Sequence, residues 1–352
     1  MDFSFTDDQL SVRDLAVQLL ADVDPKAAAG FDRTVWARLG EAGILGLSLP
    51  EADGGAGYGA TELALVCEEV GRRLARVPAA VALGGAAAPV ARHGSEALRA
   101  RLLPGLVAGT EVLTGAWAEP FGTDPLRPRT RLDGGALHGE KTAVPLAREA
   151  TAVVVPAMGP DGLVLAVVLT DAPGVTLVDV ETTSGEPAAT VLLDGAVPVE
   201  VLPAEAAVLG HQWSTVALAA TQVGIASEAL RLAAEHTSTR EQFGRPLATF
   251  QAVAVRLGNC YIDIEAMRST TWQAAYALDA GKPAAEQVAT AAFWAAEGGE
   301  RVAGSAVHLH GGLGVDTDYP LHRWFLASKQ VELALGGASR QLERLADALV
   351  PA

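Results

Sequence analysis

The 352-residue chain has little cysteine, few basic residues and no long apolar run. Its two cysteines, Cys67 and Cys260, have no CxxC partner or metal-ligand cluster nearby, which excludes a disulfide framework and predicts two core thiols. Lys and Arg number 26 against 42 Asp and Glu, so the formal net charge is −16. Because nucleic-acid binding needs basic surface that releases counterions from phosphates, we expect no nucleic-acid partner.

Membrane signals are also missing from the sequence. The opening residues, MDFSFTDDQL, carry no positive charge ahead of an apolar stretch, and no later window is uninterruptedly apolar over a bilayer-spanning length. We therefore expect a cytoplasmic protein with no membrane partner. Half of the residues are apolar and 19% are charged, which favours a large core shared by two or three packed units.

Hydrophobic spacing divides the chain into three parts. Residues 1–110 have helical spacing around a loop rich in Gly at 43–60, with further breaks at Pro78, Gly84 and Gly85. Residues 111–205 contain short β runs separated by Pro, Gly and Asp turns, and residues 206–352 return to helical spacing. The long helices predicted in this last part cover 212–239, 247–280, 283–308 and 325–348.

This order predicts an α+β multidomain fold. We expect an N-terminal α-helical domain (1–110), a middle β-barrel or β-sandwich domain (111–205) and a C-terminal four-helix bundle (206–352) that binds flavin and oligomerises. The glycine runs at 54–59 and 311–314 lack the strand–turn–helix setting of a dinucleotide fingerprint. Neither therefore predicts a Rossmann site.

Two strings in the C-terminal part combine residue types that suit a nucleotide. REQFGRPLATFQAV places Arg240, Phe243, Gly244 and Gln251 at the junction of two predicted helices. Arg offers a fork of donors to phosphate, an aromatic ring stacks on a flat heterocycle, and Gly admits close backbone approach. The second string, HLHGGLGVDTDYPLHR, ends a helix in a glycine turn whose bare N–H groups could meet a pyrophosphate.

Together with the helix–β–helix order, these strings resemble the acyl-CoA dehydrogenase family along the whole chain. That family's flavin site uses an RxxFG…Q segment and a QxxGG segment from a neighbouring subunit. LGEAGILGLSLPEADGGAGYG resembles the family's helical-domain loop, WAEPFGTD its TEPxxGSD string, and LHGEKTAVPLA its NGxK strand. The resemblance implies FAD as the cofactor, with binding residues Arg240, Gln242, Phe243, Gln251, His308, Gly311 and Gly312.

Several positions depart from the family pattern. Ala118 replaces the usual Thr, one residue is missing from the following turn, and Thr123 stands at the Ser position. Ala143 and Val144 stand where Trp and Ile are usual, so aromatic cover of the flavin ring is lost. In the C-terminal strings, His308 stands where Gln is usual and would make its contact dependent on tautomer or pH.

The family's reaction needs a carboxylate base that removes the α-proton beside the thioester while the β-hydride passes to flavin N5. By resemblance, Gly336 occupies the usual Glu position, and Ser214 occupies the position that a minority of members use. The nearby family Arg falls at Thr215. We therefore assign no catalytic residue in this chain, although helix-surface carboxylates remain as replacements: Glu332, Glu228 and Glu235.

The resemblance thus implies the base-less subunit of an α2β2 complex that oxidises an acyl-CoA to its α,β-unsaturated form, such as a steroid or polyketide-like CoA ester. Its partners would be a base-bearing acyl-CoA dehydrogenase subunit, the acyl-CoA, and an acceptor such as electron-transfer flavoprotein. One alternative is a homomeric flavoenzyme with an unrecognised base or a different oxidation. Another is a flavin-free scaffold subunit.

Other residue groups have plainer interpretations. His308, His310 and His322 lack a completing carboxylate or Cys spacing, so we expect no metal site. Ser305 and Ser339 lack a nucleophile elbow. Two further groups stay open: Arg127, Arg129 and Arg131 either meet CoA phosphates or form a solvated turn, and Trp117 and Trp213 either shape a pocket or fill the core.

Overall fold

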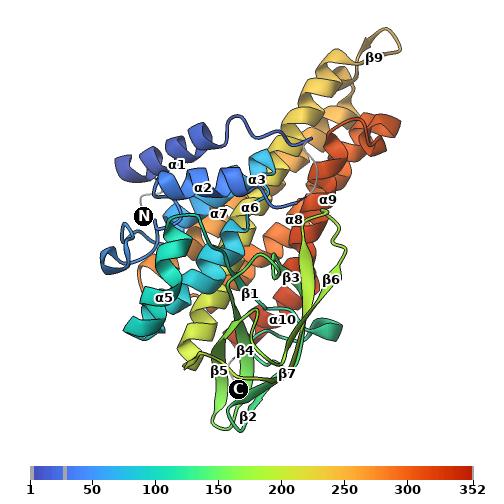
Figure 1. Ribbon diagram of the computed structural model, residues 1–352. Coiled ribbons are helices and arrows are strands. Elements are labelled where there is room, and N and C mark those ends of the chain that lie inside the picture. Colours follow the sequence, from blue (N-terminus) through green and yellow to red (C-terminus); the bar gives the residue numbers. More distant parts are fainter. Residues whose placement is uncertain (1–3, 27–29, 351–352) are drawn as a thin grey trace. The chain divides into compact units, whose positions relative to one another are not determined.

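The computed structural model describes residues 4–26 and 30–350, and Figure 1 traces their helices and strands. They form two compact units, which we call the sheet unit and the helical unit. The sheet unit contains residues 4–19, 30–66 and 76–217, and the helical unit contains residues 20–26, 67–75 and 218–350. The predicted order of helices, sheet and helices is confirmed. The exact domain boundaries at 110 and 205 stay predictions.

The first part of the sheet unit is helical, and two of its helices begin at capping side chains. Asp32 accepts a hydrogen bond from the N–H of Val35 at the start of α2, and Ser95 accepts one from Leu98 at the start of α5. Such caps satisfy donors that the first turn leaves unpaired. The helices of this part are α1 (Asp7–Leu19), α2 (Arg33–Glu41), α3 (Ala60–Arg73), α4 (Ala88–His93) and α5 (Glu96–Val107).

The predicted break at Gly84 and Gly85 is wrong. Both residues lie in a π-helical stretch, Ala80–Ala87, that runs directly into α4. A Cβ on Gly84 would come within 3.0 Å of the carbonyl carbon of Trp213, and one on Gly85 within 2.8 Å of Nε1 of Trp117. These glycines therefore permit Ala80–Ala87 to approach Trp213 and Trp117 closely. Sequence spacing does not distinguish a glycine of this kind from one that ends a helix.

In the described residues, the middle of the sheet unit is one eight-stranded sheet. Its strand order is β6-β7-β3-β2-β4-β5-β8, with β1 pairing in parallel with β4. β4 and β5 pair from Ala152↔Leu169 to Gly159↔Gly162, which forms a tight hairpin. Buried side chains of β3, β4, β5 and β7 make one core cluster. The strands are β1 (Leu113–Gly115), β2 (Arg131–Asp133), β3 (Ala136–Pro145), β4 (Ala152–Gly159), β5 (Gly162–Leu169), β6 (Val175–Val180), β7 (Ala188–Ala196) and β8 (Glu200–Leu202).

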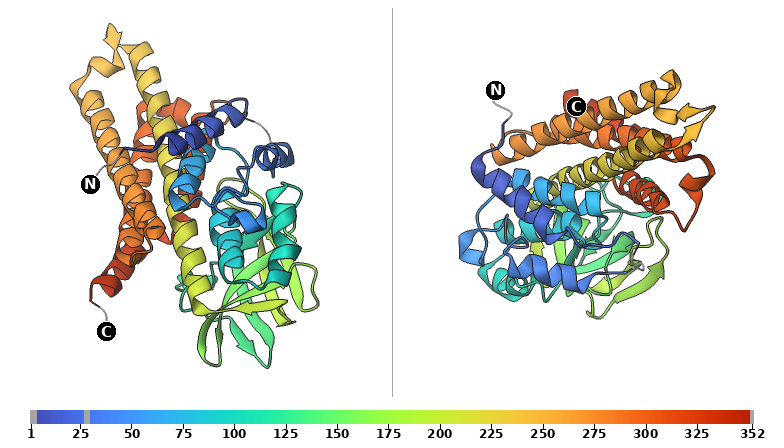
Figure 2. Two further views of the ribbon diagram at one scale, coloured as in Figure 1. Left: turned by 90° about the vertical axis from the view of Figure 1, so that its left-hand side faces the viewer. Right: turned by 90° about the horizontal axis from the view of Figure 1, so that it is seen from above.

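The helical unit begins within α6 and is formed by long helices. The chain of α6 passes from the sheet unit into the helical unit at Leu218, and the end of α3 also belongs to this unit. Figure 2 shows that a short hairpin, β9 (Glu241–Gln242) and β10 (Arg245–Pro246), joins the ends of α6 and α7. The helices are α6 (Ala204–Thr239), α7 (Gln251–Asp279), α8 (Ala285–His310), α9 (Leu321–Ala334) and α10 (Gly337–Leu349).

The continuous helix predicted over 325–348 is wrong, because α9 ends at Ala334 and α10 begins at Gly337. Gly336 and Gly337 have φ values of +83° and +77°. Glycine adopts this left-handed conformation readily, and it commonly ends helices. Apolar spacing continues across the break, which is why the sequence indicated one helix.

Glycines also allow helices of this unit to pack closely. A Cβ on Gly224 would lie 1.8 Å from the carbonyl oxygen of Glu68, and one on Gly71 would lie 2.0 Å from that of Thr221. The backbones of α3 and α6 are therefore in direct contact here. A core cluster lies in the same unit, made of Val223, Ala226, Cys260, Ile264, Met267 and Val302.

One helix in the described part of the chain, α6, is long and apolar enough to cross a membrane by length and composition alone. Of its most apolar window, 61% is buried inside the structure. That burial is what a core helix of a globular protein shows.

Candidate functional site

A buried ion pair fixes the segment after β1 to strand β3. Nζ of Lys141 lies 2.7 Å from Oε1 of Glu119, and the two side chains are 0% and 2% exposed. The same carboxylate accepts hydrogen bonds from the N–H of Arg129 at 2.7 Å, and from the N–H and hydroxyl of Thr130 at 3.0 and 2.7 Å. The strings WAEPFGTD and LHGEKTAVPLA, which the sequence presents separately, are thus joined by one carboxylate.

Burial and pairing oppose each other in this ion pair. Burial lowers the pKa of Lys141 to about 8, because it outweighs the attraction of Glu119. Burial also disfavours the charge on Glu119, but the Lys141 ammonium and the hydrogen bonds from Arg129 and Thr130 hold its pKa below the usual value. We therefore expect both groups to be charged at neutral pH.

The segments that this pair joins have unusual backbone conformations. Phe121 has φ +65°, Ala143 has φ +48° and Leu146 has φ +48°. Strand β3 loses its regular register against β7 between Lys141 and Val144, so Ala143 lies in an irregularity of the strand. Ala143 is exposed and Val144 is buried, so the two positions where the family usually carries Trp and Ile do not face the same environment.

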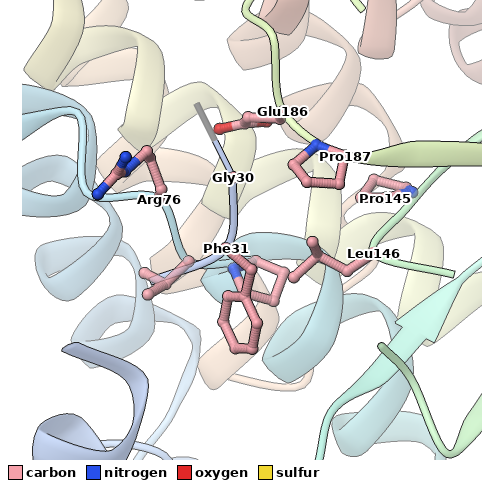
Figure 3. Close-up of a pocket in the computed structure, with 9 residues that line it drawn as sticks. Gly30, Phe31, Arg76, Pro145, Leu146, Glu186 and Pro187 are labelled. Carbon is pink, nitrogen blue, oxygen red and sulfur yellow. The ribbon is translucent and has the colours of Figure 1, made fainter. Parts of the chain in front are cut away.

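A narrow cleft lies beyond the end of β3 (Figure 3). The space in it that admits a water-sized group is about 30 Å³. This is below the usual range of about 300–1,000 Å³ for small-ligand pockets, so the cleft does not accommodate an acyl-CoA. Its lining residues are Gly30, Phe31, Arg76, Val77, Pro78, Pro145, Leu146, Glu186 and Pro187.

The first predicted flavin segment forms the β9–β10 hairpin of the helical unit. Phe243 and Gly244 are its two turn residues, with φ values of +55° and +78°, and Gln242 pairs with Arg245 across the turn. Two positive φ values match a type I′ turn. Phe243 is 92% exposed, and Arg240, directly after α6, is exposed as well. The hairpin thus presents an aromatic ring and a guanidinium to solvent.

The remaining predicted flavin residues lie at helix ends in the same unit. Gln251 is the first residue of α7 and is exposed, and His308 is exposed near the end of α8. Gly311 and Gly312 are exposed, and a Cβ on either would meet nothing within 4 Å. The expectation of bare N–H groups is wrong for Gly311, whose N–H donates to the carbonyl of His308 and closes the helix.

A stacked histidine pair links these two segments. The rings of His236, in the last turn of α6, and His310, the last residue of α8, lie 4.3 Å apart with an interplanar angle of 20°. Nδ1 of His310 lies 2.8 Å from the carbonyl oxygen of Ala306, and its Nε2 lies 3.1 Å from the hydroxyl of Tyr319. These partners assign the proton to Nδ1 and make Nε2 the acceptor. The stack therefore brings the ends of α6 and α8 together.

We expect this pair to make the fold sensitive to acid. Burial, then His310 and Arg240, lower the pKa of His236, and burial lowers the pKa of His310. Below pH 6.5, the ordinary pKa of histidine, the unfolded chain binds protons more readily than the folded chain does. The free energy of unfolding therefore falls as the pH falls. Urea unfolding between about pH 7.5 and about pH 5 should show this loss, and His236→Phe should reduce the slope. Equal slopes for both proteins would contradict the assignment.

Neither position expected from the resemblance for a base offers a carboxylate. Gly336 has φ +83°, so a side chain there would strain the backbone even though a Cβ would meet only Arg340, at 3.5 Å. Ser214 is buried, and its hydroxyl donates to the carbonyl of His211 at 3.1 Å. A Cβ on Gly85 would lie 3.3 Å from Cβ of Ser214, so a side chain at position 85 would crowd Ser214.

The carboxylates suggested as replacements are held in ion pairs. Glu332 lies 2.8 Å from Nζ of Lys329. Glu228 and Glu235 both bind Arg231, at 2.7 and 2.9 Å. These ion pairs engage the carboxylate oxygens that a general base would direct at its substrate, so none of the three is placed as a general base.

Sequence reasoning missed the two polar clusters that organise these segments. The resemblance drew attention to the WAEPFGTD and LHGEKTAVPLA strings but gave no role to Glu119 or Lys141. The sequence predicts only a helix-end histidine at His310 and indicates no role for His236. Their positions, next to Gly311 and one turn before Arg240, were the available signal. Trp213 is buried, and Arg92 lies 4.3 Å above its ring, so it belongs to the core of the sheet unit.

Comparison with known proteins places these features in a family. Residues 6–110 match the N-terminal domain of acyl-CoA dehydrogenase, and residues 206–350 match its C-terminal domain. Acyl-CoA dehydrogenase FadE27 of Mycobacterium tuberculosis is 40% identical over 326 residues, which cover 90% of this chain and 87% of FadE27.

Two solved structures share the whole architecture. The ChsE4-ChsE5 complex of Mycobacterium tuberculosis contains a chain with a TM-score of 0.93 and 38% identity, and each chain covers 100% of the other. A variant of the Tcur3481-Tcur3483 steroid ACAD gives a TM-score of 0.92 and 42% identity, with 97% of each chain covered. Sequence and fold agree over the same residues, and this chain belongs to the acyl-CoA dehydrogenase family.

Proposed function

We propose that this chain is the base-less subunit of a heteromeric, FAD-dependent acyl-CoA dehydrogenase, and that a partner subunit supplies the catalytic Glu. The observation that carries the proposal is a contrast within the chain. The segments expected to bind flavin form an exposed hairpin and exposed helix ends, whereas Gly336 and Ser214 offer no carboxylate.

The exposed residues of the helical unit fit a dinucleotide. Arg240 provides a guanidinium for phosphate, and Phe243, at 92% exposure, provides a ring for a flat heterocycle. Among the residues that the structure describes, none requires a glycine at position 312, since a Cβ there would meet none of their atoms within 4 Å. The missing side chain leaves room for a group from outside the chain. FAD, when bound, would supply the hydride acceptor.

The outer face of α7 supports an assembly with another subunit. Val255, Tyr261 and Ile262 are 54%, 60% and 64% exposed on this helix. A groove between α7 and α8 lies beside them, lined partly by Arg256, Asn259, Asp263, Arg301 and Gly304. Exposed apolar side chains beside a groove are typical of a surface that another protein covers. We therefore propose an α2β2 complex in which this face is covered.

The relatives guide the choice of partner and substrate. The ChsE4-ChsE5 structure is a complex, and Tcur3481-Tcur3483 is described as a steroid ACAD. By this likeness, the partner is a base-bearing acyl-CoA dehydrogenase subunit and the substrate is a bulky, steroid-like acyl-CoA. We further propose a cytoplasmic location and electron-transfer flavoprotein as the acceptor.

Co-expression tests this proposal directly. The chain purified alone should be colourless or inactive, and co-purification with a base-bearing partner should give yellow protein with about one flavin per heterodimer, because the site is shared. Absorption in the flavin bands and acyl-CoA-dependent bleaching are the readouts. Robust dehydrogenation by the chain alone would favour a homomeric enzyme, and a stable complex whose flavin is unaffected by Arg240→Ala would favour a scaffold.

A further inference from the structure

The stacked pair His236 and His310 lies between the two segments of the helical unit that the resemblance assigns to flavin. The carbonyl oxygen of His236 accepts a hydrogen bond from the N–H of Arg240 at 2.8 Å, so the first segment starts from this histidine. The second segment, Gly311–Val315, follows His310 and folds back on it, because a Cβ on Gly314 would lie 3.2 Å from Cβ of His310. The stack therefore sets the spacing between the two segments.

His310 is fixed through both nitrogens of its ring. Nδ1 donates to the carbonyl of Ala306, and Nε2 accepts from the hydroxyl of Tyr319. The ring of Tyr319 also lies against that of His310, with their centroids 5.3 Å apart. Both nitrogens are thus engaged inside the chain instead of being offered to a ligand, and His236 stacks on a ring that is already held in place.

The stack depends on the charge of its two rings. Neutral imidazoles stack favourably, whereas two imidazolium rings 4.3 Å apart repel each other, and the guanidinium of Arg240 adds to that repulsion. The nearest carboxylate in the sequence, Glu235, is already bound to Arg231 at 2.9 Å, so it compensates little. Acid therefore opposes the stack. The other charged or titratable groups on the surrounding elements are Glu228 on α6, Glu241 and Arg245 in the hairpin, Arg256 on α7, His308 on α8, Asp316, Asp318 and Tyr319 before α9, and His322 and Arg323 on α9.

We propose that His236 and His310 are positioning residues that form a pH-sensitive latch. While both rings are neutral, the stack keeps the hairpin that carries Arg240 and Phe243 beside the turn Gly311–Val315, and protonation of the pair separates them. The inference rests on the proposed function, because these are the two segments that it assigns to flavin. The direction follows from burial, which lowers the pKa of both rings: the opened latch takes up protons more readily than the closed one does.

Acid should therefore weaken the binding of FAD to the co-purified complex. Between about pH 7.5 and about pH 5.5 we expect the dissociation constant to rise about tenfold, since an affinity linked to one proton changes by up to about tenfold per pH unit. Flavin fluorescence measures this constant. Tighter binding in acid would overturn the latch, because it is the result that histidines facing the phosphates would produce.

Two substitutions at position 236 separate stacking from titration. His236→Ala removes the stack and should weaken FAD binding by about three- to tenfold at neutral pH. His236→Phe supplies a ring that stacks but takes up no proton, so it should recover much of that affinity and give a flatter pH profile. A pH profile for His236→Phe as steep as that of the unmodified complex would contradict the inference.

Hydrogen–deuterium exchange of the flavin-free complex tests the latch without its ligand. After correction for the intrinsic effect of pH on exchange, amides within 240–247 and 311–316 should be less protected at about pH 5.5 than at about pH 7.5, and His236→Phe should remove most of this difference. Unchanged protection in the unmodified complex would show that the stack stays closed, and it would overturn the inference.

His138→Phe is the matched control. The side chain of His138 is 48% exposed on β3 of the sheet unit, with Nδ1 3.7 Å from Oδ1 of Asp194. This variant makes the same change outside the latch and should keep the full pH dependence of FAD binding; a profile as flat as that of His236→Phe would reject the latch. If the complex binds no FAD at neutral pH, the proposed function fails, and the exchange measurement still decides whether the stack opens.

Discussion

Lys141→Met should lower the free energy of unfolding by about 3–5 kcal/mol, since it leaves the carboxylate of Glu119 buried without its cation. Both side chains are almost fully buried, so water cannot replace the lost partner. The remaining hydrogen bonds from Arg129 and Thr130 compensate only in part. Chemical denaturation of the purified protein measures the effect.

Two further variants test whether an unpaired buried charge causes the loss of stability in Lys141→Met. Glu119→Gln combined with Lys141→Met removes both charges, and it should be more stable than Lys141→Met alone because no unpaired charge is buried. Arg148→Met breaks an exposed ion pair with Asp179 and should leave the denaturation midpoint nearly unchanged. If Lys141→Met and Arg148→Met behaved alike, the buried pair would have no special role.

Gly224→Ala should destabilise the helical unit by about 3 kcal/mol or more, because overpacking at a backbone contact cannot be relieved by a rotamer change. The new Cβ would lie 1.8 Å from the carbonyl oxygen of Glu68 and 2.7 Å from the N–H nitrogen of Arg72. Both are main-chain atoms of α3, so a whole helix must move. The thermal midpoint and the yield of folded protein are the measurements.

Gly258→Ala is the matched control on α7. Gly258 is exposed and a Cβ there meets nothing within 4 Å. Replacing a helical glycine by alanine at an open position should stabilise the protein by about 0.5–1 kcal/mol. If Gly224→Ala lowers the stability and Gly258→Ala raises it, close packing and not helix propensity decides the effect of the added methyl group. A loss at both would disprove this explanation.

Much of the fold could be predicted because helices and strands repeat apolar residues with different periods. The long helices α6, α7 and α8 follow this rule, and their predicted ends differ from the observed ones by a few residues at most of the termini. Gly84 and Gly336 could not be interpreted in the same way. One glycine lies within a helical stretch to admit a neighbouring backbone, whereas the other ends a helix. Only the surrounding atoms distinguish these two uses.

The candidate site was less accessible to sequence reasoning. The hairpin at Phe243 was located through its motif, and its exposure agrees with a role outside the chain. Contacts between distant residues could not be predicted from the sequence, because a turn and strand β2 lie between Glu119 and Lys141, and His236 and His310 lie on different helices. A pair of this kind appears only when topology brings its members together.

The double-glycine break between α9 and α10 affects how this chain could change over evolutionary time. A single mutation that introduces Glu at position 336 places a side chain at φ +83°, and this strain lowers the free energy of unfolding by about 1–2 kcal/mol. The loss occurs whether or not the new carboxylate is positioned to accept a proton. An ancestor that had lost its carboxylate here would therefore find direct reversion selected against. In the proposed complex, one subunit helps to bind FAD and the other supplies the catalytic Glu. The two would then remain dependent on each other even after the original advantage of sharing the site in this way had disappeared.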